Sequence, residues 1–207
     1  MAFGLAVAQA CFAATFRGPR QRFWQRMTTT GLALGGYARL PVNDPAEVKI
    51  GPREVVLGTA SAAVLYATFR AGDRFARAVV PTGEREILEI YGLREIAPRP
   101  EIAARLALVI GPAEELFWRG FVQRSLAARY GRWHGAALAT AAYGGVHIVT
   151  CNFTLFGAAG VAGAHWGTLS ALGAPMGALI VSHVIWDVWI FLVQPTDRRL
   201  PESATSA

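Results

Sequence analysis

Charged residues are scarce in this 207-residue sequence. They make up 16% of the chain, whereas 53% of the residues are hydrophobic. A typical soluble domain carries about 25% charged residues, so the composition argues against a water-soluble globule. The scarcity is greatest between Trp133 and Gln194, a run of 62 residues with no lysine, no arginine and a single acid, Asp187. Such a run cannot cover a soluble surface, but it can supply about three membrane spans at roughly 20 residues each.

Cysteine is almost absent too. Cys11 and Cys151 each lie in an apolar segment and match no metal-binding spacing, so the sequence indicates neither a disulfide framework nor a cysteine metal site. The 20 basic residues exceed the 14 acidic ones, but the arginines form short clusters that flank apolar segments. That pattern is typical of membrane-flanking charge and not of a nucleic-acid-binding stripe. We therefore expect the lipid bilayer, and no nucleic acid, as a partner.

The apolar segments predict an all-α fold, a polytopic membrane bundle of about six to seven spans around a buried polar site. The segment Met27–Leu40 is short and glycine-rich, so spanning, interfacial and re-entrant placements all remain open for it. Between Arg70 and Pro100 the charges alternate with apolar residues, which indicates an amphipathic surface helix. The arginine clusters compete, so the sequence leaves the membrane orientation open. The predicted segments are 2–16, 27–40, 55–69, 102–122, 134–150, 153–172 and 176–193.

This pattern divides the chain into three parts. Residues 1–101 hold the N-terminal spans and the amphipathic surface segment, and residues 102–194 form the membrane core that carries the site. Residues 195–207 form a short polar tail.

Ionisable residues within a span are costly, so each is by default a candidate functional residue. On the span that begins near Ile102, Glu115 and Arg119 are four residues apart and can pair on one helix face, while Glu114 points about 100° away. One carboxylate is thereby neutralised locally, and the other is free to face a cavity.

Two further polar pairs show the same four-residue spacing, Tyr143 with His147 and His183 with Asp187. Counted along their helices, Glu114, His147 and His183 lie at roughly 15, 20 and 12 Å from the same side of the membrane, at 1.5 Å per residue. Three costly groups at similar depth predict one buried polar site. We interpret the remaining histidines, His134 and His165, as packing residues.

In order and spacing, these motifs resemble those of the CPBP family. Its members are the CAAX-processing and bacteriocin-processing intramembrane proteases, also called Abi or Rce1-type. The resemblance covers about Ala104 to Gln194. The motifs are Glu-Glu-x-x-x-Arg at Glu114, Glu115 and Arg119, aromatic-x-x-x-His at Tyr143 and His147, and His-x-x-x-Asp at His183 and Asp187.

The resemblance implies an intramembrane endopeptidase that acts on a membrane-tethered protein or peptide. Glu114 matches the glutamate that activates water, and His147 and His183 match the two site histidines. Asp187 stands where the family often has Asn. An ionised aspartate cannot donate a hydrogen bond to an oxyanion, so we expect Asp187 to orient His183 and to favour its protonated form.

The residues Glu115, Arg119 and Tyr143 are expected to support the site, with Tyr143 standing where Phe is commoner in the family. We expect no obligatory cofactor, because the sequence lacks HExxH and an obvious third nitrogen or sulfur ligand, although two histidines and carboxylates could hold zinc. The alternatives are a non-catalytic membrane scaffold or regulator of the same fold and, less favoured, a proton-coupled transporter. We expect an integral protein of the bacterial inner (plasma) membrane.

Overall fold

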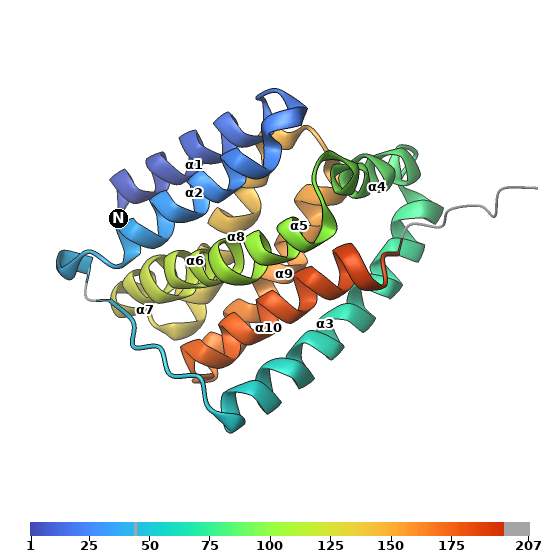
Figure 1. Ribbon diagram of the computed structural model, residues 1–207. Coiled ribbons are helices and arrows are strands. Elements are labelled where there is room, and N and C mark those ends of the chain that lie inside the picture. The colour runs from blue at the N-terminus through green and yellow to red at the C-terminus, as the bar shows by residue number, and fades with distance from the viewer. Residues whose placement is uncertain (44, 197–207) are drawn as a thin grey trace, which may run out of the picture.

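The computed structural model describes residues 1–43 and 45–196 and forms a bundle of helices (Figure 1), with no strand among those residues. Most of the predicted polar tail, residues 197–207, lies outside the described residues. The helices are α1 (Ala2–Phe16), α2 (Phe23–Ala38), α3 (Pro52–Val79), α4 (Gly83–Tyr91), α5 (Arg99–Arg105), α6 (Gly111–Glu115), α7 (Arg124–Tyr130), α8 (Arg132–Val146), α9 (Phe153–Ala171) and α10 (Met176–Val188).

Shorter helical pieces connect or extend these helices. The 3₁₀ turns are η1 (Arg20–Arg22), η2 (Pro41–Asn43), η3 (Gly92–Ile96) and η6 (His147–Thr150), and the π-helical pieces are η4 (Leu106–Ile110), η5 (Leu116–Gln123) and η7 (Trp189–Val193).

Residues 99–130 form one continuous helical rod in which α6 lies between two π-helical pieces. Pro112 has no N–H to bond the carbonyl four residues earlier, and a proline ring crowds that carbonyl. Just before it the helix is wider, since the N–H of Gly111 bonds the carbonyl of Leu106, five residues back. Such π segments often mark functional sites. Here they flank Glu114 and Glu115.

The helices α3 and α10 lie side by side (Figure 1) because small residues let their backbones approach. A Cβ added to Gly58 would lie 2.6 Å from a methyl carbon of Val181, so only glycine fits there. The hydroxyls of Ser61 and Ser182 also join the two helices, 2.8 Å apart. Small residues and hydroxyl groups of this kind are typical of helix contacts in a bilayer.

Two described helices, Pro52–Val79 and Met176–Val193, have the length and hydropathy of a membrane span, and Ala2–Phe16 is apolar but shorter. The count of six to seven spans stays a prediction. The segment Met27–Leu40 forms most of α2, which is a continuous helix.

The amphipathic helix is shorter than the sequence indicated. Residues 70–79 continue α3, and the surface helix is α4 alone, which packs against α3 and α9 at one end of the bundle (Figure 1). Its Glu86 is buried and accepts hydrogen bonds from the Thr82 hydroxyl at 2.7 Å and from the backbone N–H and hydroxyl of Thr154, both at 2.8 Å. Burial raises the pKa of Glu86, but these hydrogen bonds outweigh it and hold the pKa below its usual 4.5.

Candidate active site

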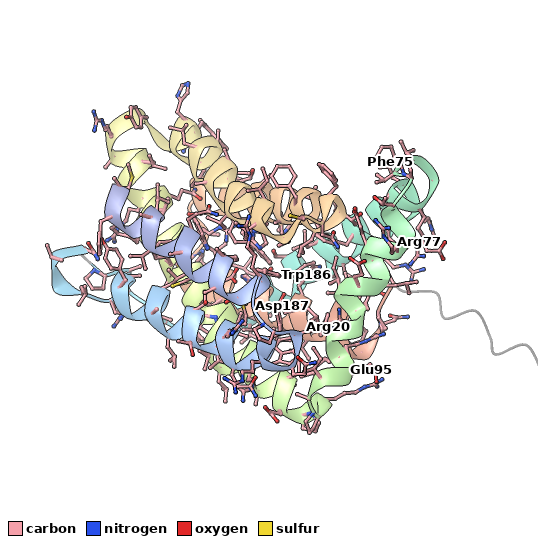
Figure 2. All side chains as sticks on the ribbon, turned by 90° about the horizontal axis from the view of Figure 1, so that it is seen from above. Arg20, Phe75, Arg77, Glu95, Trp186 and Asp187 are labelled. Atoms are coloured by element: carbon pink, nitrogen blue, oxygen red, sulfur yellow. The ribbon has the colours of Figure 1, made fainter. Side chains whose placement is uncertain are left out.

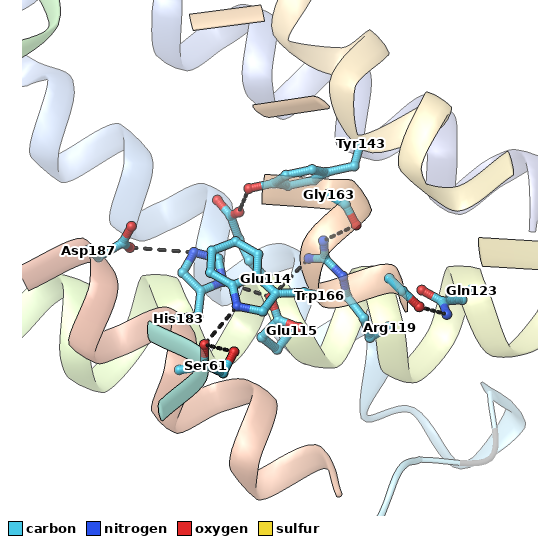
Figure 3. Close-up of polar contacts among 12 residues, drawn as sticks. Ser61, Glu114, Glu115, Arg119, Gln123, Tyr143, Gly163, Trp166, His183 and Asp187 are labelled. Carbon is cyan, nitrogen blue, oxygen red and sulfur yellow. Dashed lines mark hydrogen bonds and ion pairs between the residues drawn. The ribbon is translucent and has the colours of Figure 1, made fainter. Parts of the chain in front are cut away.

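Glu114 and Tyr143 meet across two helices at the centre of the bundle. The Tyr143 hydroxyl donates to Oε2 of Glu114 at 2.9 Å, and both side chains are buried (Figure 3). Tyr143 comes from α8 and Glu114 from α6. The bond fixes one carboxylate oxygen of Glu114 and leaves the other available for a reacting group.

Next to this pair, the carboxylate of Glu115 contacts two other polar side chains. Its Oε1 accepts from Arg119 Nη1 at 2.9 Å, as the four-residue spacing indicated, and also contacts His183 Nδ1 at 2.7 Å. The Glu115 side chain is 0% exposed, so both contacts act in a poorly solvated interior, where electrostatic interactions are strengthened. The sequence did not indicate the contact with His183, because the two residues are 68 positions apart.

His147 lies where α8 tightens into η6. Its Nδ1 lies 2.8 Å from the carbonyl oxygen of Tyr143. A carbonyl can only accept, so Nδ1 carries the proton and Nε2 is the acceptor in the neutral ring. The ring of Phe12 from α1 makes a T-shaped contact with the imidazole, with centroids 4.9 Å apart.

His183 and Asp187 face each other on α10, with 3.5 Å between His183 Nε2 and Asp187 Oδ2. This distance is longer than the 2.7 Å contact between His183 and Glu115. The carboxylate that holds His183 most closely is therefore Glu115, whereas the sequence hypothesis assigned that role to Asp187.

These groups converge on one cavity of about 510 Å³, which is lined by Glu114, Tyr143, His147, His183 and Asp187. Figure 2 shows the bundle from above, with Asp187 near the middle of the molecule. The other walls are mostly apolar and come from both halves of the chain. They include Phe16, Phe23, Met27, Phe69, Ile87 and Tyr91.

One aromatic residue at the site was not found from the sequence. The indole of Trp166 on α9 stacks on the His183 ring, with centroids 4.0 Å apart and an interplanar angle of 14°. Its Nε1–H donates to the Ser182 hydroxyl at 3.0 Å. The sequence shows a tryptophan among small residues in a helix, but nothing local indicates its partner.

The histidines interpreted as packing residues do not line the cavity. His165 Nε2 lies 2.9 Å from the Ser61 hydroxyl, and His134 is exposed near the start of α8. Within residues 1–43 and 45–196, no three His, Cys, Asp or Glu side chains form a group that could hold a metal ion. The carboxylates and imidazoles that line the cavity are those of Asp73, Glu114, His147, His183 and Asp187.

Part of the chain matches a known protein family. Residues 100–189 match the family of type II CAAX prenyl endopeptidase Rce1-like proteins. No curated protein and no solved structure matches the chain. All seven site residues named from the sequence, from Glu114 to Asp187, fall within the matched region. Over residues 100–189, the chain is therefore similar to the Rce1-like family of type II CAAX prenyl endopeptidases.

Proposed function

We propose that this protein is an intramembrane endopeptidase that hydrolyses a peptide bond of a membrane-associated protein or peptide with a water activated by Glu114. The observation that carries the proposal is the convergence of Glu114, His147 and His183, from three separate helices, on one largely apolar cavity. A carboxylate and two imidazoles in such a setting can perform general acid–base catalysis. We expect the bilayer in question to be a bacterial plasma membrane.

In this mechanism Glu114 and His147 prepare the water. The Nδ1–H of His147 is used by the Tyr143 carbonyl, so Nε2 can accept a hydrogen bond from the water. Glu114 removes one proton as the water oxygen attacks the carbonyl carbon of the scissile bond. It then delivers that proton to the leaving amine as the C–N bond breaks, so protons and charge balance.

His183 is assigned to the oxygen of the tetrahedral intermediate. Glu115 contacts its Nδ1 and fixes the ring, and a donor at Nε2 can stabilise the negative charge that develops on the carbonyl oxygen. Asp187, 3.5 Å from Nε2, supports a protonated ring. Glu115 therefore takes the larger part of the orienting role, and Asp187 the smaller.

The cavity also bears on the substrate. Its aromatic and aliphatic walls, such as Phe16, Met27 and Phe69, favour an apolar group next to the scissile bond. We propose as substrate a peptide held at the membrane by a lipid modification or by an apolar segment.

The test is to incubate the purified protein in liposomes with a peptide library and to map cleavage by mass spectrometry. Wild type should cleave, and Glu114→Ala should not. Glu89→Ala, which removes an exposed carboxylate from α4, is the matched control and should cleave as wild type does. Identical cleavage maps for wild type and Glu114→Ala would refute the protease. If cells that carry Glu114→Ala keep the biological phenotype of wild type, the scaffold would be favoured.

A second arm of the experiment adds a metal chelator. We expect hydrolysis to persist there, and a loss of hydrolysis that added zinc restores would establish a metal.

A further inference from the structure

Trp166 covers one face of His183 in a nearly parallel stack. The ring centroids are 4.0 Å apart, the planes differ by 14°, and the exposed fractions are 0% for Trp166 and 3% for His183. Figure 3 shows the indole overlapping the imidazole beside Glu115. Water is therefore excluded from that face of the imidazole.

The indole is itself fixed by a chain of hydroxyl groups. Its Nε1–H donates to Ser182 at 3.0 Å, and Ser182 is 0% exposed. The Ser182 hydroxyl lies 2.8 Å from that of Ser61, and Ser61 lies 2.9 Å from Nε2 of His165. Three helices, α3, α9 and α10, thus contribute to holding the plane of one tryptophan.

Ser182 and His183 are consecutive on α10, and Trp166 contacts both. It bonds the serine through its N–H and covers the histidine with its ring. Glu115 contacts Nδ1 of the same histidine at 2.7 Å. With one edge and one face occupied, the imidazole cannot turn without losing a contact. The remaining ring nitrogen, Nε2, lies on the side of Asp187 and the cavity.

We infer that Trp166 is a positioning residue, which holds His183 in the orientation that directs Nε2 to the reacting carbonyl, and that Ser182 keeps Trp166 in place. This inference rests on the proposed function, since it assigns His183 to the oxyanion. An indole face also favours a cation stacked on it, so the same contact stabilises the imidazolium that donates to the oxyanion.

The test compares Trp166→Phe with Trp166→Leu in the purified full chain. Phenylalanine keeps an aromatic face but loses the N–H that bonds Ser182, so its kcat should fall by about tenfold at most, the scale of one hydrogen bond. Leucine removes the face and should lower kcat about 100-fold, the size expected for a catalytic group displaced by about 1 Å, with KM little changed. The matched control is Trp133→Leu, which removes an exposed tryptophan at the start of α8 and should leave both constants unchanged. Equal kcat in Trp166→Leu and wild type, or equal losses in the two Trp166 variants, would overturn the inference.

Ser182→Ala provides the test if Trp166→Leu does not fold. It removes one oxygen that bonds the indole and should lower kcat by up to about tenfold, the scale of one hydrogen bond. An unchanged kcat in this variant would overturn the inference.

A spectroscopic readout separates this inference from the proposed protease. The His183 ring protons lie in the ring current of the indole, so their NMR resonances in histidine-labelled protein should be displaced, and the displacement should decrease in Trp166→Leu and change in Ser182→Ala. If wild type shows the displacement but no hydrolysis, the proposed function fails while the contact stands. If wild type hydrolyses peptides and the resonances do not respond, only the positioning role fails.

Discussion

Glu86 and Glu114, one from each half of the chain, are both 4% exposed but lie in different surroundings. Glu86 in the N-terminal half accepts hydrogen bonds on both oxygens, from Thr82 and Thr154. Among the described residues, Glu114 accepts one hydrogen bond, from Tyr143, and it lines the cavity. A buried carboxylate whose oxygens are all occupied anchors structure, whereas one with a free oxygen beside a cavity can react.

The same contrast extends to the two halves as a whole. To the cavity the N-terminal half contributes mainly apolar walls, together with polar groups such as Asp73 of α3. The site carboxylates and imidazoles come from α6, η6 and α10 of the C-terminal half. The family match begins at residue 100 and so excludes the helices that supply those walls. We infer that the chemistry lies in the C-terminal half, and that the shape offered to a substrate depends on both.

The largest expected effect comes from Glu114→Gln. It keeps the volume and the Tyr143 contact but removes the base, so kcat should fall by about 1,000-fold, within the range for loss of a general base. Helicity and thermal stability should remain close to wild type. Steady-state kinetics measures the loss, and activity within a few-fold of wild type would assign the base to another residue.

Tyr143→Phe removes the hydrogen bond that fixes Oε2 of Glu114. The ring and its packing against Trp118, at 5.3 Å between centroids, remain, so the protein should fold. We expect kcat to fall by up to about tenfold, because one hydrogen bond is worth about 1 kcal/mol. Steady-state kinetics at saturating peptide concentration measures this change in kcat. Unchanged kcat would mean that the bond does not hold Glu114 in its reactive position.

Glu86→Gln should affect stability and leave the chemistry intact. The amide cannot accept on both of its heavy atoms, so we expect a loss of about 2 kcal/mol, the scale of hydrogen bonds to a charged group, with unchanged kcat in the protein that remains folded. Thr29→Ala changes an exposed residue of α2 and serves as the control, which should leave both stability and kcat unchanged. A large fall in kcat without loss of stability would place Glu86 in the reaction and remove the contrast with Glu114.

The stability difference between wild type and Glu86→Gln should depend on pH, because the pKa of Glu86 is lowered in the folded protein. Its folded-state pKa lies below the usual 4.5, so the carboxylate contributes stability that is present above the unfolded-state pKa and lost as pH falls through the folded-state value. The difference in Tm between wild type and Glu86→Gln should therefore be constant near neutral pH and shrink below about pH 4.5. Thermal melts across that window measure it, and a difference that grows on acidification would contradict the assignment.

The smallest effect is expected from Asp187→Asn. Asparagine preserves the side-chain shape beside Nε2 of His183, and Glu115 still holds Nδ1. Hydrolysis should stay within a few-fold of wild type when product formation is followed by mass spectrometry. Complete loss would give Asp187 an indispensable role and would make it, and not Glu115, the main partner of His183.

Much of this organisation could be predicted from the sequence because it depends on local spacing. The pair of Glu115 and Arg119 follows from four-residue spacing along a helix. Similar depth along three helices indicated that Glu114, His147 and His183 share a site, and all three line one cavity. The end of α3 was misplaced, since the charged residues from Arg70 onward continue that helix to Val79, and charge alone does not end a helix.

By itself, the sequence determined the helical, apolar character of the chain, the polar residues within its helices, and the motif order that carries the family resemblance. Only the tertiary structure decided that Glu115 is the close partner of His183, that Trp166 stacks on that ring, and that the N-terminal helices wall the cavity. The physical reason is that periodicity defines which face of a helix a residue occupies. Which helix meets that face depends on how small and large side chains fit together across the bundle, as Gly58 and Val181 do.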